Sequence, residues 1–250
     1  MMRNSPNVAF GHLPVSRAQR AGSVALLAAA VAFATPAALE AQVGHLPQAS
    51  PYEDLKVGQN LSLSVGWLTM RRDPANVAAK SAPYGSVRYD IAIGGPAAFY
   101  VRYAAAPSER RLLLPSNPLA TRVISTPKVT THVADLGLDL SLTGKKSWHR
   151  LSPSLTGGIG MVSDFTQADT GAYKFGSKFA FTYGFAMRYF LRSGIALRAD
   201  VTNFTWQYRY PDRYFVKASD STSVLSDTRA RSAYRGNWGA SAGVTFPLFR

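Results

Sequence analysis

The sequence has no cysteine and few charged residues for its length. The absence of cysteine among its 250 residues excludes a disulfide scaffold and a cysteine-based zinc site. Only 17% of the residues are charged, compared with about 25% in an average soluble protein. With 46% hydrophobic and 12% aromatic residues, this composition disfavours a disordered chain or a polybasic tail. Basic residues outnumber acidic ones by 28 to 14, so the net charge is +14.

Long apolar runs are also scarce, and the one that stands out lies at the amino terminus. Three arginines precede a short uncharged run at 22–34, and Ala41 is the small residue at the expected cleavage position. We therefore predict that residues 1–41 are a cleaved signal peptide and that the protein is exported. A membrane-spanning helix is the alternative, but the dense apolar part is shorter than about 18 residues and Pro36 interrupts its end. The mature chain would carry a net charge of +12, because three arginines and Glu40 are lost.

Beyond the leader, apolar residues fall on alternate positions, which is the period of a strand with one apolar and one polar face. The pattern occurs in eight segments that approach the roughly 9 to 11 residues of a tilted membrane strand. They are residues 59–67, 86–93, 99–104, 135–142, 155–161, 178–191, 195–202 and 237–248. Several aromatic residues on the apolar phase lie near segment ends, as in a membrane girdle. Beyond Val201 the aromatic residues take the other phase, at Phe204, Trp206 and Tyr208, which indicates a bulge or a strand continuing above the membrane.

The connections alternate between long and short. The long ones are 72–83, 105–128, 166–174 and 210–233, and the short ones are 94–96, 143–147 and 192–194. This rhythm is typical of an all-β fold, an eight-stranded antiparallel up-and-down transmembrane β-barrel with tight periplasmic turns and long outer loops. We predict this barrel over residues 59–250. Residues 42–58 lack alternation and are predicted to be a periplasmic lead-in segment.

Charged residues within the segments all fall on the polar phase. Facing lipid at mid-depth, each Arg or Lys would cost about 2 to 4 kcal/mol, so we predict that they face inward. This lumen charge network comprises Arg88, Asp90, Arg102, Asp135, Asp139, Lys178, Arg188, Arg198 and Asp200. Eight strands enclose a space that side chains can fill, which predicts a packed polar interior rather than a wide pore. The alternative is a narrow channel or transporter for small apolar or ionic solutes.

The carboxy terminus resembles the assembly signal of bacterial outer-membrane barrels, which the barrel-assembly machinery reads. The residues that carry this resemblance are Ser241, Gly243, Phe246, Leu248 and Phe249. Two features depart from the pattern. The chain ends on Arg250 after the aromatic residue, and Pro247 lies inside the last predicted strand, where it cannot donate to the ladder.

The chain from 42 to 250 as a whole resembles the small eight-stranded outer-membrane β-barrel family, and is similar in architecture to outer-membrane proteins A, X and W. The resemblance implies an integral outer-membrane protein in a Gram-negative-type envelope, porin-like in its strands and expected to be a monomer. It rests on the strand pattern and brings no catalytic residues and no cofactor.

The four long connections and their flanks carry +7 of the mature charge. Clustered cations at a membrane surface attract anionic phosphates, so we predict contacts with outer-membrane glycolipid, with Arg229, Arg231 and Arg235 as candidates. Nucleic acid is not an expected partner, because an exported barrel has no routine access to it. The predicted role is structural or surface-interacting.

An enzyme that modifies lipid A is the third hypothesis. It would need a nucleophilic serine near a histidine with an acidic partner. His132 is the one histidine expected at the outer rim, with Thr131 and Ser125 nearby, but no matched carboxylate is identifiable. No two histidines share a connection, which argues against a metal site. We therefore expect no catalytic activity, metal or cofactor.

Overall fold

The computed structural model describes residues 50–55, 58–165, 173–191 and 194–249. The predicted signal peptide and the first part of the lead-in, residues 42–49, lie outside the described residues. Every described strand falls in Pro51–Arg250, which forms one compact unit. Among the residues described, no helix is long and apolar enough to span a membrane.

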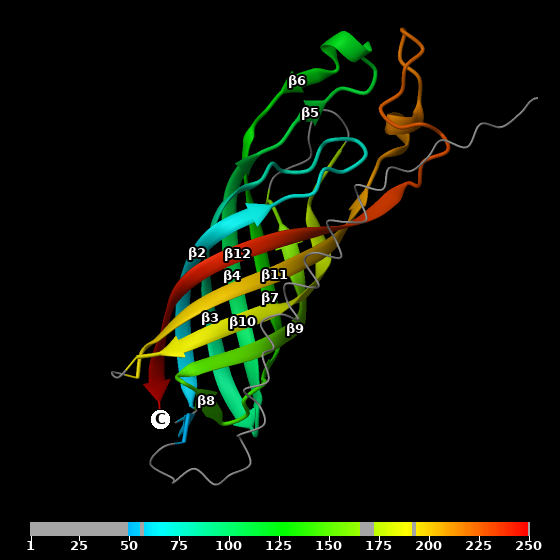
Figure 1. The fold of residues 1–250 in the computed structure, drawn as a ribbon. Helices are drawn as coiled ribbons and strands as arrows, with labels where there is room; N and C mark the ends of the chain where they lie inside the picture. The colour runs from blue at the N-terminus through cyan, green and yellow to red at the C-terminus, as the bar shows by residue number, and fades with distance from the viewer. Residues whose placement is uncertain (1–49, 56–57, 166–172, 192–193, 250) are drawn as a thin grey trace, which may run out of the picture. The chain divides into compact units, whose positions relative to one another are not determined.

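The secondary structure consists almost entirely of strands (Figure 1). In chain order the elements are β1 (Tyr52–Asp54), β2 (Gln59–Thr69), β3 (Ala82–Gly94), β4 (Ala97–Glu109), β5 (Leu112–Leu113), the 3-10 helix η3 (Leu119–Thr121), β6 (Val123–Ser125), β7 (Lys128–Ser141), β8 (Lys146–Trp148), β9 (Leu151–Ser163), β10 (Ser177–Phe190), β11 (Ala196–Arg209), the 3-10 helix η4 (Asp212–Phe215) and β12 (Ser232–Phe249).

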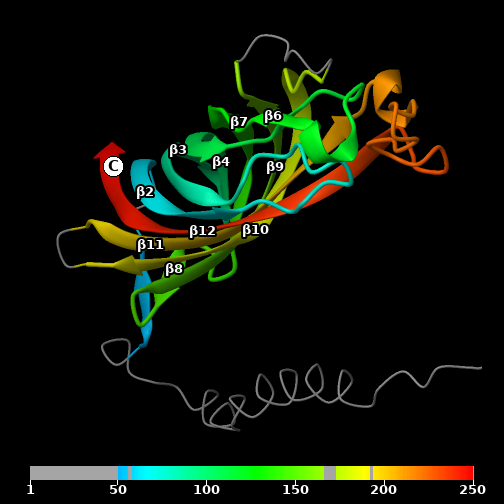
Figure 2. The same ribbon diagram turned by 90° about the horizontal axis from the view of Figure 1, so that it is seen from above.

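Eight of these strands form a closed antiparallel barrel. They pair in the order β2-β3-β4-β7-β9-β10-β11-β12, so each strand lies beside its neighbours in the sequence. The last strand pairs with the first, from Trp238 opposite Thr69 to Phe249 opposite Gln59, and this pairing closes the sheet (Figure 2). Closure leaves no exposed barrel edge. The predicted eight-stranded up-and-down barrel is confirmed.

Glycines allow close strand contact at the β2–β12 seam. A Cβ atom added at Gly243 would overlap the backbone carbonyl of Leu63, and one added at Gly66 would overlap that of Ala240. These two glycines therefore let the first and last strands approach without a steric clash.

The strands extend further than predicted toward the end that carries the long connections, here called the long-loop end. β7 begins at Lys128 although its alternation is clear only from residue 135, and β11 continues to Arg209. The second connection also contains an unpredicted hairpin, because β5 pairs with β6. The opposite end, where the connections are tight, is the short-turn end.

The two faces of the barrel wall differ sharply. Each strand presents exposed apolar side chains on its outward phase, for example Val65, Val87, Val101, Leu138, Leu155, Phe181, Val201 and Trp238, which are 45–73% exposed. Side chains on the inward phase are mostly buried and polar near the short turns, and buried and apolar near the long loops. Near the short turns the apolar side chains of the wall thus face outward, whereas near the long loops apolar side chains occupy both faces.

Candidate functional site

A layer of eight charged side chains fills the short-turn half of the barrel interior. None is more than 8% exposed. They are Arg88, Asp90, Arg102, Asp135, Asp139, Arg188, Arg198 and Asp200. Four arginines face four aspartates, so the layer is neutral overall. Burying charges is tolerated only when they are paired and hydrogen-bonded.

Two of the pairs are bidentate, the stronger geometry for an arginine and a carboxylate. Arg102 donates from Nε to Asp135 Oδ1 at 2.9 Å and from Nη2 to Oδ2 at 2.8 Å. Arg198 donates from Nε to Asp200 Oδ2 at 2.8 Å and from Nη2 to Oδ1 at 2.8 Å. The first pair joins the adjacent strands β4 and β7, and the second stays on β11.

Asp139 connects strands that are not neighbours. Its Oδ2 atom accepts from Arg88 Nη2 on β3 at 2.6 Å and from Arg198 Nη2 on β11 at 3.4 Å. Because β3, β7 and β11 are not adjacent in the sheet, these contacts cross the lumen. The charge layer thereby links opposite parts of the wall.

Tyr100 belongs to this layer, although the sequence reasoning missed it. It is 1% exposed, its hydroxyl donates to Asp135 Oδ2 at 3.1 Å, and the Arg88 guanidinium lies 3.9 Å from its ring centroid. Tyr100 lies two residues before Arg102 in β4, so the two side chains point to the same face of the sheet. This spacing in the sequence could have placed Tyr100 inside. An arginine over a desolvated aromatic ring is a favourable contact.

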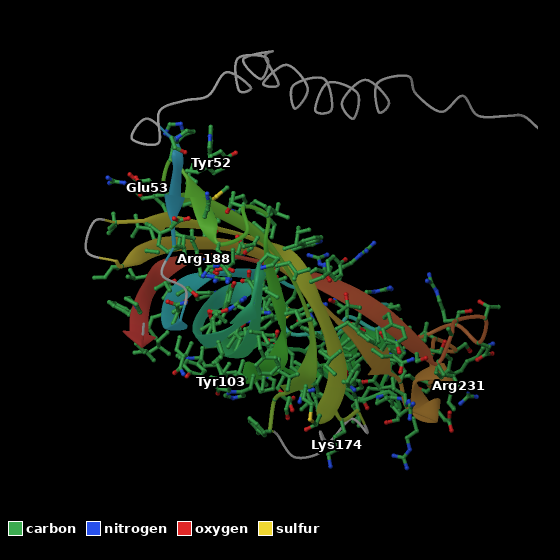
Figure 3. All side chains as sticks on the ribbon, turned by 90° about the horizontal axis from the view of Figure 1, so that it is seen from below. Tyr52, Glu53, Tyr103, Lys174, Arg188 and Arg231 are labelled. Carbon is green, nitrogen blue, oxygen red and sulfur yellow. The ribbon has the colours of Figure 1, made fainter. Side chains whose placement is uncertain are left out.

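Arg188 and Lys178 differ from the other predicted members. Arg188 lies inside the barrel (Figure 3) and makes no ion pair with a described residue. It lines a small cavity of about 40 Å³ at the short-turn end, together with Asp139 and Asn60. Lys178 is half-buried toward the long-loop end, with Nζ 5.1 Å from the Phe175 ring. The structure therefore brings together eight of the nine predicted residues and leaves Lys178 apart.

The long-loop half of the interior is aromatic. Phe204, Trp206 and Tyr208 are at most 1% exposed, on the same phase of β11 as the charged Arg198. β11 pairs in unbroken register with β10 as far as Trp206 and with β12 as far as Arg209. Of the two interpretations that the sequence allowed, the bulge is wrong and the continuing strand is confirmed. The sequence suggested a phase change because the inward residues switch from charged to aromatic.

Loops close the barrel above the aromatic layer. Asp73 in the first connection is buried and accepts from the backbone N–H groups of Ala75 and Ala78 and from the Tyr210 hydroxyl at 2.9 Å. Burial, reinforced by the Asp73 carboxylate, raises the pKa of Tyr210 above its ordinary value, so that its hydroxyl remains a donor. Arg110 and Asp164, both buried, join the second and third connections at 3.1 Å. The interior is thus covered at this end by folded loops.

The described part of the lead-in is attached to the short-turn end. β1 pairs with β8, with Tyr52 opposite Trp148 and Asp54 opposite Lys146. Leu55 N–H also donates to the Lys145 carbonyl at 2.8 Å, and Leu55 lines the small cavity beside Arg188. The segment thus contributes a wall to this end of the interior.

The residues of the predicted assembly signal lie on β12. Ser241 and Gly243 occupy the inward phase, and Phe246 and Leu248 are exposed on the outward phase. The register with β2 shifts between Pro247 and Phe249. A strand tolerates proline where its ladder is irregular, which explains how the departure at position 247 fits the sheet.

The three arginines proposed for glycolipid contact do not form one cluster of free cations. Arg229 is exposed, whereas Arg231 makes an ion pair with Asp212 and lies over the Phe215 ring at 5.4 Å. Arg235 is half-buried on β12 and donates to the Tyr234 carbonyl at 3.1 Å. Figure 3 shows Arg231 far from the charged interior around Arg188.

His132 lies on the outer wall, not in a catalytic arrangement with its sequence neighbours. Its Nδ1 atom hydrogen-bonds to the Tyr103 hydroxyl at 2.6 Å, and its ring lies 4.8 Å from that of Phe165. Thr131 is buried on the opposite face of β7, and Ser125 belongs to β6 in the loop hairpin. Within the described ranges, no three histidine or carboxylate side chains gather to hold a metal ion.

No protein-family model and no curated protein matches the chain. Among solved structures, the chain is similar to the Yersinia pestis outer membrane protein Ail in a phospholipid bilayer nanodisc, with 14% identity over 75% of this chain and 99% of that one and a TM-score of 0.36. A crystal structure of Ail in complex with the heparin analogue sucrose octasulfate has 14% identity over 76% of this chain and 100% of that one, with a TM-score of 0.34. The crystal structure of a major outer membrane protein from Thermus thermophilus is also similar, with 10% identity over 75% of this chain and 98% of that one and a TM-score of 0.35. The strand pairing by itself defines the closed eight-stranded barrel.

Proposed function

We propose that this protein is an integral outer-membrane β-barrel with a structural or surface-interaction role. The observation that carries the proposal is the belt of exposed apolar side chains on all eight strands. Soluble monomers rarely expose contiguous apolar patches above a few hundred Å². A closed sheet that places its charges inside and its apolar residues outside is suited to lipid, where backbone groups must be paired internally.

Aromatic residues on the wall support the same placement. Trp67, Tyr103 and Trp238 are exposed toward the long-loop end, while Trp148 and Tyr189 are exposed toward the short turns. Trp and Tyr collect at the two interfaces of a bilayer. In the orientation usual for outer-membrane barrels, the long loops face outward and the amino-terminal lead-in lies in the periplasm. Assembly by the barrel-assembly machinery through the β12 signal belongs to this proposal.

The interior favours a closed barrel over a solute channel. Ion pairs fill the short-turn half, and Phe204, Trp206 and Tyr208 fill the long-loop half. We therefore infer that its interactions take place at its outer loops, and we propose a monomer without catalytic activity. The excess of basic residues at that end makes anionic glycolipid the favoured partner.

The experiment is heat-modifiable gel mobility on separated envelope fractions. An outer-membrane barrel should be enriched in the outer-membrane fraction and should migrate as a compact band until boiled. Recovery in the soluble periplasmic fraction, or identical mobility before and after boiling, would contradict the proposal.

A further inference from the structure

An open groove of about 530 Å³ lies on the long-loop rim of the outer wall, where β3 begins, β4 ends and β7 begins. We call it the rim groove. It is lined by Lys80, Ser81, Ala82, Pro83, Pro107, Ser108, Glu109, Lys128, Val129 and Thr130. Pro83 and Pro107 occupy the outward phase of their strands and are exposed, so the groove opens on the side that faces lipid in the proposed function.

The groove changes from apolar to cationic toward its loop side. Pro83 and Pro107 contribute apolar rings on the strand side. Beyond them, Lys80 and Lys128 are exposed, and Glu109 lies between the two strand ends. Lys80 Nζ lies 2.9 Å from Glu109 Oε2, while the Lys80 side chain remains 57% exposed. The two lysines thus outnumber the single carboxylate, and Lys80 keeps surface available for another anion.

A second hollow continues the cationic surface. It has a volume of about 210 Å³ and is lined by Lys80, Arg72 and Arg111 among others. Both arginines are exposed. Lys80 and Ser81 line both hollows, so four cations lie around two neighbouring hollows at the rim.

The chain around Lys80 is held in place by hydrogen bonds. Lys80 N–H donates to the Glu109 carbonyl at 2.8 Å, and the Ser108 hydroxyl donates to the Lys80 carbonyl at 2.5 Å. The Met70 N–H donates to Ser81 Oγ at 3.0 Å. A site whose backbone is already ordered loses less conformational entropy when it binds a ligand.

We propose that the rim groove binds the phosphate-bearing headgroup of an outer-membrane glycolipid. The proposal rests on the proposed function and assigns its glycolipid contact to Arg72, Lys80, Arg111 and Lys128 instead of the loop arginines at 229, 231 and 235. A glycolipid would place its acyl chains against the apolar strand side of the groove and its phosphates at the cationic loop side. The groove has an apolar surface next to the strands and a cationic surface next to the loops, which matches this arrangement. Lys and Arg recognise phosphate through charge-assisted hydrogen bonds.

Glu109 gives the proposal a distinctive signature. Its carboxylate competes with a phosphate for Lys80, at 2.9 Å. Glu109→Gln should therefore strengthen binding of an anionic headgroup, whereas a purely structural role for the ion pair would weaken it or leave it unchanged.

The test uses the full mature chain folded in phospholipid nanodiscs that contain either purified lipid A or a neutral lipid of the same chain length. Bound lipid A is quantified by native mass spectrometry. The groove variant is Lys80→Gln, Arg111→Gln, Lys128→Gln. The matched control is Arg213→Gln, Lys217→Gln, Arg229→Gln, which removes three exposed cations from the fourth connection. Heat-modifiable mobility confirms that each variant is folded.

We expect the groove variant to lose lipid A affinity by about tenfold or more, the control to stay within about twofold, and Glu109→Gln to bind more tightly. Equal losses in groove and control variants would overturn the site while leaving glycolipid contact intact. No loss in either folded variant would overturn the glycolipid contact itself. Inorganic phosphate at millimolar concentration should not displace lipid A; full displacement would show a free-phosphate site and overturn the lipid as occupant.

Discussion

Arg88 Nη2 donates to Asp139 Oδ2 at 2.6 Å across the barrel, from β3 to β7 with β4 between them. The same carboxylate oxygen accepts from Arg198 on β11. A barrel wall is held mainly by neighbouring strand pairs, and these contacts add direct links between strands that do not pair. Asp139 and Arg198 therefore both join the interior charge layer across strands that do not pair.

Replacing Asp139 should destabilise the barrel strongly. Asp139→Ala leaves Arg88 and Arg198 without this carboxylate in a buried site, and breaking one side of a buried pair costs about 3–5 kcal/mol. Urea unfolding in lipid vesicles, followed by gel mobility, measures the change in the free energy of unfolding. The control is Asp54→Ala, because Asp54 is 87% exposed and lies 3.9 Å from Lys146; it should cost less than about 1 kcal/mol. Similar losses in both variants would contradict the linking role of Asp139.

Closure of the barrel should depend on Gly243. An added Cβ atom would overlap the Leu63 carbonyl, so Gly243→Ala should destabilise the folded barrel by about 1–3 kcal/mol and lower the yield of the heat-modifiable form. Gly157→Ala is the matched control, since no atom lies within 4 Å of the added Cβ. If the two variants refold equally well, the close β2–β12 approach is not a requirement for closure.

The interior should not conduct freely. Trp206 and Tyr208 are fully buried in the long-loop half, and ion pairs occupy the short-turn half. Purified protein in planar bilayers should show no steady large conductance. A stable current of porin size would favour the channel hypothesis over the packed interior.

The contact between the second and fourth connections should persist in acid. Leu119 N–H donates to Asp220 Oδ2 at 2.6 Å, and this bond, followed by that from Thr222, lowers the pKa of Asp220 from 3.8 to about 2. Because the folded pKa is depressed, the stabilisation is fully present above the ordinary pKa and is lost as the pH falls through about 2. The protection factor of the Leu119 amide, which is the intrinsic hydrogen-exchange rate divided by the observed rate at the same pH, should remain high at pH 4 and fall near pH 2. Asp220→Asn should weaken this protection at pH 4; unaltered exchange would argue against the contact.

The sequence predicts the architecture of the fold because membrane-type alternation is local. Each of the eight segments carries its own period, and the long and short connections order them. Strand ends are predicted less well, since β7 begins at Lys128 in a region where the outward residues are no longer apolar. Phe204, Trp206 and Tyr208 left a bulge and a continuing strand open for a related reason. Hydrophobicity marks the outer face near the short turns, whereas near the long loops apolar side chains also fill the interior.

The interior charges are predictable by phase, but their partners are not. The alternation of side chains along each strand places Arg88 and Asp139 inside. The contact between them, however, depends on the curvature that brings β3 opposite β7. The same holds for the rim groove. Lys80 and Lys128 come from separate connections, and only the β3–β4–β7 pairing brings them to one surface.

The apolar outer wall of the barrel is proposed to face lipid, and the four native tryptophans allow a direct measurement. Trp238 is 49% exposed on the outer wall, whereas Trp206 is buried inside. Variants that retain one of these two, with the other tryptophans replaced by Phe, can be folded into vesicles of brominated phospholipid, whose bromines quench nearby indoles. We predict strong quenching for the Trp238 variant and little for the Trp206 variant. Equal quenching of both, or none of Trp238, would contradict a lipid-facing barrel with a packed interior.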